Sequence, residues 1–326
     1  MNRVRKSDLA IVGAGAWGTA LAICVGRAGC DVVLWGRDGA ALAALLRSGT
    51  HPALPDASLP DRVTVTDRLP DLCGVETILL ATPAQAIRAV AGDLDRTGVV
   101  PDRVIVAAKG IEQSTRCTMP ELAGALWPSA EIGMLSGPTF ATELARGLPA
   151  AATLAASDLT IARELARFFA GSDLRLYASD DLTGVAMGGA VKNVLAIAAG
   201  AVMGARLGAN ARAAVISRGL AELTRLGLAL GARPETLSGL SGLGDLVLSC
   251  TDEQSRNYSF GFALGRGEPP PAKLAEGALT AAPLVELARR HRVEMPIAEA
   301  VNAVLNDGLP LREAVAGLLK RPEGLE

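Results

Sequence analysis

Residues 9–25 read LAIVGAGAWGTALAICV, and this stretch decides how the first half of the chain folds. A short apolar run leads into a G-x-G-x-x-G pattern formed by Gly13, Gly15 and Gly18, and a helical pattern follows. The first glycine permits a tight turn, the second lets the backbone approach a pyrophosphate, and the third allows helix and strand to pack closely. The helix N-terminus then faces the anion. The sequence predicts a dinucleotide-binding turn; the alternative is a glycine turn in an α/β protein without a ligand.

Beyond this turn, short β-branched runs alternate with Ala- and Leu-rich helical patterns. Such alternation is typical of a doubly wound parallel sheet with helices on both faces. We expect strands at Leu9–Val12, Asp31–Trp35, Val63–Thr66, Thr77–Ala81, Val104–Ala108, Ile132–Leu135, Ala151–Ala155 and Leu174–Tyr177. Helices expected between them include Gly18–Ala28, Gly39–Ser48 and Ala84–Asp93.

From about Asp180 strand-like runs disappear and long helical patterns take over. We expect helices at 183–207, 211–230, 259–266, 276–292, 296–307 and 310–320. A Gly- and Ser-rich stretch, 238–257, is expected to interrupt them as a loop. The sequence therefore predicts an α/β protein with a dinucleotide-binding domain at 1–182 and an all-helical domain at 183–326.

The end of the second predicted strand bears on which dinucleotide is bound. Proteins that bind NAD usually place an Asp or Glu there to hold the ribose hydroxyls. Here the strand ends in Trp35-Gly36-Arg37-Asp38. Arg37 can pair with a 2′-phosphate, which favours NADP, while Asp38 keeps NAD open. The alternative for Arg37 is a solvated loop arginine.

Lys192 is the only charged residue between Val185 and Ala205, in the run VAMGGAVKNVLAIAAGAVMGA. The run is long enough to span a bilayer, but its central Lys192-Asn193 pair and its glycines favour a buried helix of a soluble protein. A desolvated lysine can serve as a proton donor and acceptor near neutral pH. Burial lowers the pKa of a lysine and a neighbouring carboxylate raises it, so the sequence leaves the balance open.

Two segments follow predicted strands, at the sheet edge where open α/β sheets bind ligands. Lys109 lies in AAKGIE, residues 107–112, and Thr139 lies in SGPTFA, residues 136–141. We expect Lys109 to project into the binding cleft and the Gly-Pro turn to present backbone N–H groups and the Thr139 hydroxyl. The alternatives are a surface lysine and an ordinary turn.

A third segment, GLGD followed by SRN, covers residues 242–257. Arg256 can grip a phosphate with its planar guanidinium, and Ser255 and Asn257 can add neutral hydrogen bonds. Asp245 is a candidate partner of Lys192; the alternative is a helix cap.

The composition excludes several classes of function. A net charge of -2 and a pI near 5.9 give no reason to expect nucleic acid or an anionic membrane surface. Five dispersed cysteines without CxxC spacing argue against disulfides and zinc and fit a reducing cytoplasm. The two histidines, His51 and His291, are far apart, so no metal site is expected.

Several long motifs together resemble the bacterial type of NAD(P)-dependent glycerol-3-phosphate dehydrogenase. They are GAGAWGTALA, VVLWGRD, AAKGIE, LSGPTFATELARGLPAA, GGAVKNVLAIAAG, GANARAAVISRGLAEL, GLGDLVLSCTDEQSRN and VEMPI. The resemblance implies a Rossmann domain, a helical substrate-binding domain and a homodimer in the cytoplasm. It implies interconversion of dihydroxyacetone phosphate and sn-glycerol 3-phosphate for glycerophospholipid synthesis. The interpretation of residues 185–205 as a buried helix predicts no membrane insertion.

The resemblance also implies roles for individual residues. Lys192 is expected to accept the proton in the oxidative direction. The expected substrate contacts are Lys109, Gly137, Thr139, Lys192, Asn193, Asp245, Ser255, Arg256 and Asn257. The expected cofactor contacts are Gly13, Gly15, Ala16, Trp17, Gly18, Arg37, Lys109, Ala141, Arg256, Leu274 and Glu276.

The chain departs from the family pattern in a few places. Trp17 stands where the family often has Phe or Tyr, and Ala16 where Ser is frequent. The region 268–282 is the least similar to the family. Two other classes stay open: a different Rossmann dehydrogenase acting on a hydroxy acid or sugar acid, and a non-catalytic dinucleotide-binding protein.

Overall fold

The computed structural model describes residues 7–271 and 275–319 and divides the chain into two compact units. The sheet unit comprises Met1–Ala108 and Met119–Val185, and the helical unit comprises Lys109–Thr118 and Ala186–Glu326. The chain therefore passes into the helical unit twice. The short segment 109–118 groups with the helices although the residues on both sides of it belong to the sheet unit.

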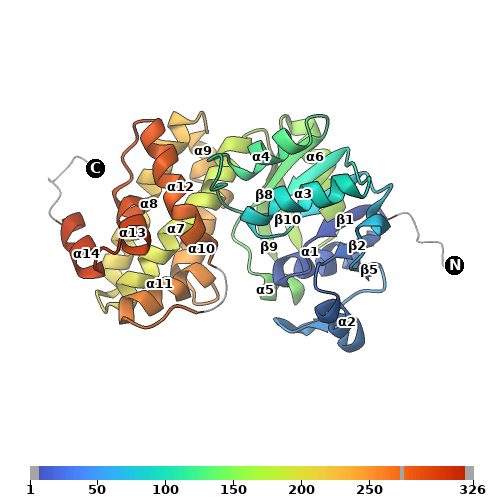
Figure 1. Cartoon of the computed structure of the whole chain (residues 1–326), viewed down its shortest axis with the longest axis horizontal. Coiled ribbons are helices and arrows are strands. Elements are labelled where there is room, and N and C mark those ends of the chain that lie inside the picture. The colour runs from blue at the N-terminus through green and yellow to red at the C-terminus, as the bar shows by residue number, and fades with distance from the viewer. Residues whose placement is uncertain (1–6, 272–274, 320–326) are drawn as a thin grey trace. The chain divides into compact units, whose positions relative to one another are not determined.

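The sheet unit is built on an eight-stranded sheet with the order β10-β9-β8-β7-β6-β1-β2-β5 (Figure 1). The strands are β1 (Leu9–Val12), β2 (Val32–Trp35), β5 (Val63–Thr66), β6 (Thr77–Leu80), β7 (Arg103–Val106), β8 (Glu131–Ser136), β9 (Ala150–Ala155) and β10 (Leu174–Ser179). Neighbours pair in parallel, except that β8 and β9 are antiparallel. The predicted strands are all present, and the fold class is confirmed. Every residue of β1, β2 and β6 is buried, as expected for a parallel sheet covered on both faces.

The helices of the sheet unit connect its strands. They are α1 (Ala16–Arg27), α2 (Gly39–Ser48), α3 (Ile87–Arg96), α4 (Met119–Leu126), α5 (Ala141–Ala145) and α6 (Leu159–Ala166), with 3-10 turns η1 (Leu69–Leu72), η2 (Ala84–Ala86) and η3 (Arg167–Phe169). A hairpin of β3 (Thr50–His51) and β4 (Leu54–Ser58) was not expected, because prolines weaken its strand pattern. Its Leu54 and Ala57 pack on Ala20 and Ile23 of α1.

The helices of the helical unit are coloured yellow to red in Figure 1. It contains α7 (Leu182–Gly204, beginning in the sheet unit), α8 (Gly208–Ala229), α9 (Pro234–Leu237), η4 (Leu240–Gly244), α10 (Asp245–Thr251), α11 (Arg256–Arg266), α12 (Glu276–Arg290), α13 (Pro296–Asn306) and α14 (Leu311–Leu319). The predicted helices are present, but the expected loop at 238–257 is wrong. That stretch holds the π-helical turn η4 and the helix α10. A Cβ at Gly242 would lie 1.9 Å from the carbonyl oxygen of Leu237, so this glycine serves close packing.

Helix α7 runs through the core of the helical unit. Gly200 and Gly204 bring its backbone against α11: a Cβ at either would lie 2.0 Å from the oxygen of Tyr258 or 2.1 Å from that of Phe262. An 18-residue window of α7 has a mean hydropathy of 1.6, enough for a membrane span by composition, and 89% of it is buried inside the protein. Apart from the Lys192-Asn193 pair, most of the helix is apolar because its side chains lie in the core of the helical unit.

We expect Gly200→Ala to destabilise the protein by about 3 kcal/mol, because the added methyl meets backbone that cannot move aside cheaply. The readout is the midpoint of thermal unfolding. Gly317→Ala in α14 is the matched control, since a Cβ there meets nothing within 4 Å. That change should be neutral or stabilising by up to about 1 kcal/mol through helix propensity. Equal midpoints for the two variants would contradict the close approach of α7 and α11.

Candidate active site

The glycine turn of the sheet unit connects β1 to α1. Gly13 has φ +120 and lies against the chain just after β6, where a Cβ would come within 2.8 Å of the Ala81 backbone. A Cβ at Gly18 would lie 1.9 Å from the Gly13 carbonyl oxygen. Beside Gly15, in contrast, nothing lies within 4 Å of an added Cβ. The outer glycines thus serve packing and the central one borders open space. Gly15 is also the N-cap of α1 and gives it no side-chain cap, so the turn fits a pyrophosphate held on backbone N–H groups.

Arg37 and Asp38 follow β2, the strand that pairs with β1. Both are exposed. The Asp38 Oδ1 accepts hydrogen bonds from the backbone N–H groups of Ala40 (3.1 Å) and Ala41 (3.0 Å). Asp38 is therefore the N-cap of α2.

The turn after β8 places Gly137, Thr139 and Ala141 in the sheet unit. A Cβ at Gly137 would lie 2.6 Å from the Cα of Ala152 in β9, so only glycine fits there. The Thr139 hydroxyl donates to the Gly137 carbonyl at 3.3 Å, and Ala141 is the first residue of α5. The turn is thus held by its own hydrogen bond and by close packing against β9.

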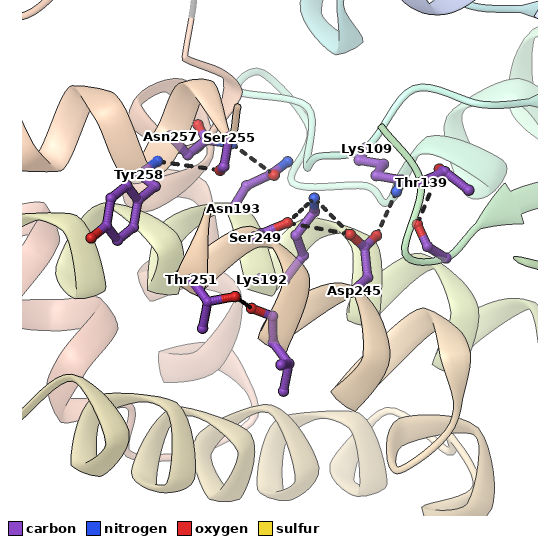
Figure 2. A network of polar contacts seen from close by, with 12 residues as sticks. Lys109, Thr139, Lys192, Asn193, Asp245, Ser249, Thr251, Ser255, Asn257 and Tyr258 are labelled. Carbon is purple, nitrogen blue, oxygen red and sulfur yellow. Dashed lines mark hydrogen bonds and ion pairs between the residues drawn. The ribbon is translucent and has the colours of Figure 1, made fainter. Parts of the chain in front are cut away.

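In the helical unit, Asp245 lies between two lysines (Figure 2). The Lys192 Nζ is 2.9 Å from Asp245 Oδ1, and the Lys109 Nζ is 2.5 Å from Asp245 Oδ2. Side-chain exposure is 11% for Lys192, 15% for Lys109 and only 2% for Asp245. The expected contact between Lys192 and Asp245 is confirmed. The sequence did not indicate that Lys109 shares the same carboxylate.

Ser249 is a member of this cluster that sequence reasoning missed. The Lys192 Nζ donates to the Ser249 hydroxyl at 2.6 Å, and that hydroxyl donates to Asp245 Oδ1 at 3.3 Å. Ser249 lies one helical turn after Asp245 on α10, a spacing that brings side chains together only in a helix. Reading residues 238–257 as a loop removed the one signal that could have found it.

Burial and the neighbouring charges shift the pKa values of Lys109 and Asp245. Burial lowers the pKa of Lys109 to about 8, the Asp245 carboxylate opposes that shift, and the Lys192 charge adds to it. Burial alone would raise the pKa of Asp245, but the two ammonium groups outweigh it and hold that pKa below its usual range. Two lysines around one carboxylate leave a surplus of positive charge, which suits an anionic ligand or an oxygen that gains negative charge.

The Ser-Arg-Asn segment opens α11. The Ser255 hydroxyl accepts from the Tyr258 N–H at 3.3 Å and caps the helix. The Asn257 amide donates to Asn193 Oδ1 at 2.8 Å and accepts from the Gly277 N–H at 2.9 Å, which ties α7, α11 and α12 together (Figure 2). Both side chains therefore have structural partners. Arg256, the first residue of α11, is exposed.

Two cofactor candidates remain, Leu274 and Glu276. Glu276 is the first residue of α12 and is half-buried. Leu274 lies outside the described residues. Within 7–271 and 275–319, no group of three or more His, Cys, Asp or Glu side chains is arranged to hold a metal ion.

Comparisons with known proteins cover almost the whole chain. Residues 8–162 match the family model "NAD-dependent glycerol-3-phosphate dehydrogenase N-terminus", and residues 181–316 match that of the C-terminus. A relative from Bradyrhizobium diazoefficiens named glycerol-3-phosphate dehydrogenase [NAD(P)+] is 49% identical over 97% of both chains. One from Azorhizobium caulinodans with the same name is 50% identical over 98% of both.

A solved structure agrees with these matches. Glycerol-3-phosphate dehydrogenase from Coxiella burnetii has a TM-score of 0.90 and 37% identity, covering 97% of this chain and 99% of that one. The fold, the glycine turn and the agreement over both halves lead to one conclusion: this chain belongs to the NAD-dependent glycerol-3-phosphate dehydrogenase family.

Proposed function

We propose that this chain catalyses the reversible, NAD(P)-dependent interconversion of dihydroxyacetone phosphate and sn-glycerol 3-phosphate. The single observation that carries the proposal is the cluster of Lys192, Asp245 and Lys109, in a chain that belongs to a family of such oxidoreductases. The cluster combines proton-transferring groups with surplus positive charge, and the reaction requires both.

Residues of the sheet unit would hold the dinucleotide. Its pyrophosphate would lie beside Gly15, where the structure has open space, on the N–H groups at the start of α1. Ala16, Trp17, Ala141 and the flanking Gly13 and Gly18 would complete the site in this unit. For Lys109, Arg256, Leu274 and Glu276, contact with the cofactor stays a prediction from the family resemblance. When bound, the nicotinamide group supplies or takes up the hydride.

Residues of the helical unit would hold and activate the substrate. Protonated Lys192 would donate to the oxygen at C2 of dihydroxyacetone phosphate as that oxygen gains negative charge, and it would take the proton back in the oxidative direction. Asp245 and Ser249 fix the Lys192 Nζ at 2.9 Å and 2.6 Å. Lys109 would add positive potential, and Arg256 would grip the phosphate, so that binding energy from a non-reacting group orients the carbonyl. Asn193, Ser255 and Asn257 would line the rest of the substrate site in this unit. For Gly137 and Thr139, contact with substrate stays a prediction from the family resemblance.

The proposal also covers the roles of the two domains, the cellular location and the assembly of the enzyme. We assign cofactor binding to residues 1–182 and substrate binding to 183–326, with the loop 109–118 contributing to the latter. The acidic pI and dispersed cysteines support a cytoplasmic enzyme, and the buried α7 supports one without membrane insertion. A homodimer and a role in glycerophospholipid synthesis follow from the family resemblance.

The test is a spectrophotometric assay of dihydroxyacetone phosphate reduction with NADPH and NADH in parallel. Oxidation of either cofactor that depends on this ketone supports the proposal. Activity only with a non-phosphorylated 2-keto acid would assign the chain to the hydroxy-acid class instead. Cofactor binding without turnover of any ketone phosphate would make it a dinucleotide-binding protein.

We expect Arg37→Ala to raise KM for NADPH by about tenfold or more and to change KM for NADH little, because a charge-assisted bond to a 2′-phosphate is lost. NADP is favoured because Asp38 already caps α2 while Arg37 is exposed. Initial rates at varied cofactor concentration measure the effect. Arg47→Ala, in the last turn of α2, is the matched control. Equal changes with both cofactors would remove Arg37 from 2′-phosphate recognition.

A further inference from the structure

The loop 109–118 is a small braced piece of structure. An antiparallel bridge joins Ile111 to Thr118 near its two ends. Within it, the Glu112 N–H donates to the Cys117 carbonyl at 2.9 Å, and the Thr115 hydroxyl donates to the Glu112 carboxylate at 2.5 Å. Because these bonds tie the loop to itself, a contact that fixes its tip also restrains Lys109 at its beginning.

The tip of the loop is fixed to α12. The Arg116 Nε donates to Glu286 Oε2 at 2.5 Å, and the Gln113 amide donates to the Leu279 carbonyl at 3.4 Å. Ile111 is fully buried in the core of the helical unit. The loop is thus held by a helix 170 residues further along the chain.

The backbone conformation of Arg116 also indicates that contacts such as the ion pair with Glu286 hold this residue in place. Its φ is +68, in the left-handed region that non-glycine residues rarely adopt. Such a conformation persists only where surrounding contacts determine it. The ion pair with Glu286 is one such contact, and it holds the turn against α12.

We propose that Arg116 and Glu286 are positioning residues for Lys109. Their ion pair fixes the loop to α12 and thereby sets the Lys109 Nζ against Asp245 on α10. This inference rests on the proposed function, which assigns Lys109 to the substrate site. Neither residue of the pair is assigned to the substrate site, so both would act through the loop.

The test compares Arg116→Gly, Glu286→Ala and the double variant in the assay of dihydroxyacetone phosphate reduction. Glycine adopts φ +68 without strain, so Arg116→Gly removes the side chain while the backbone keeps its path. Each single variant should lower kcat roughly tenfold, because small displacements of a substrate-positioning group are costly. The double variant should lose no more than either single one, since both remove the same contact.

A pH profile separates positioning from a loss of folding. Burial holds the pKa of Lys109 at about 8, with Asp245 and Lys192 the charged groups that face it. If the loop is released from α12, Lys109 becomes exposed to solvent and its pKa rises. The decrease of kcat/KM on the basic side of the pH profile (the basic limb) should then move to higher pH. Arg290→Ala is the matched control, because Arg290 donates to Glu286 at 2.6 Å from α12 itself. It should leave both kcat and the limb unchanged.

Three results would overturn the inference: wild-type kcat in Arg116→Gly, losses that multiply in the double variant, or a basic limb that does not move. Thermal unfolding of each variant identifies one that fails to fold, and Glu286→Gln then replaces it as a milder change. A wild-type enzyme that does not reduce dihydroxyacetone phosphate would count against the proposed function itself, whatever the variants do.

Discussion

Lys192→Ala is expected to lower kcat for dihydroxyacetone phosphate reduction by about 10²–10⁴-fold, the usual contribution of a positioned acid or base. The ammonium is held by Asp245 and Ser249 on α10, so it has a fixed direction in which to deliver its proton. Removing it also removes a positive charge from the side of the developing oxyanion. Steady-state kinetics at saturating substrate measure the loss.

Cofactor binding is the control for this variant. The glycine turn belongs to the sheet unit, so quenching of protein fluorescence by NADPH should give an unchanged Kd. Lys192→Met, which keeps most of the side-chain volume without the charge, should be as inactive as the alanine variant. Turnover near the wild-type rate in either variant would exclude Lys192 as the acid and base.

Asp245→Asn is expected to destabilise the protein by about 3 kcal/mol and to reduce kcat/KM strongly, since it leaves two ammonium groups together without their shared carboxylate. The Asp245 side chain is 2% exposed, so water cannot replace it. Chemical unfolding in denaturant measures the free-energy difference from the wild type. Asp56→Asn is the matched control, because Asp56 is exposed on β4 and should change the free energy of unfolding by less than about 0.5 kcal/mol.

The deficit of Asp245→Asn should depend on pH in one direction. Without the carboxylate, the pKa of Lys109 falls below its wild-type value of about 8, while in the unfolded chain it returns to about 10.4. The folded variant then binds fewer protons than the unfolded chain, so its stability increases with pH. The difference in free energy of unfolding between the variant and the wild type should therefore become smaller as pH rises toward 8. If this difference instead becomes larger as pH rises, the two lysines of the variant do not repel one another.

Much of the sheet unit follows from the sequence because its signals are local. The glycine turn, its preceding strand and its following helix lie within 9–25, and each later strand is a short apolar run bounded by turns. The hairpin β3–β4 escaped prediction because its strand residues are broken by prolines and are stabilised by packing on α1. That packing involves residues distant in sequence.

In the candidate site, too, some features follow from local sequence and others depend on residues that are distant in sequence. Lys192 stands out as a charge in an apolar run, and Asp245 follows as its partner because a buried ammonium needs one. Residues 238–257 were misjudged because glycine signals flexibility in sequence, whereas Gly242 is there so that two backbones can touch. The shared use of Asp245 by Lys109 joins residues 136 positions apart, which no local pattern encodes.

The grouping of residues 109–118 with the helices has a consequence for recombining this enzyme with its relatives. A chimaera joined at residue 182 would take Lys109 and Arg116 from one parent, and Asp245 and Glu286 from the other. The unit that contains both ion pairs is therefore discontinuous in sequence: it consists of the helical half together with residues 109–118, which lie within the sequence of the sheet unit. A chimaera that takes residues 109–118 and 183–326 from one parent would keep all four of these residues, and the contacts between them, from a single sequence.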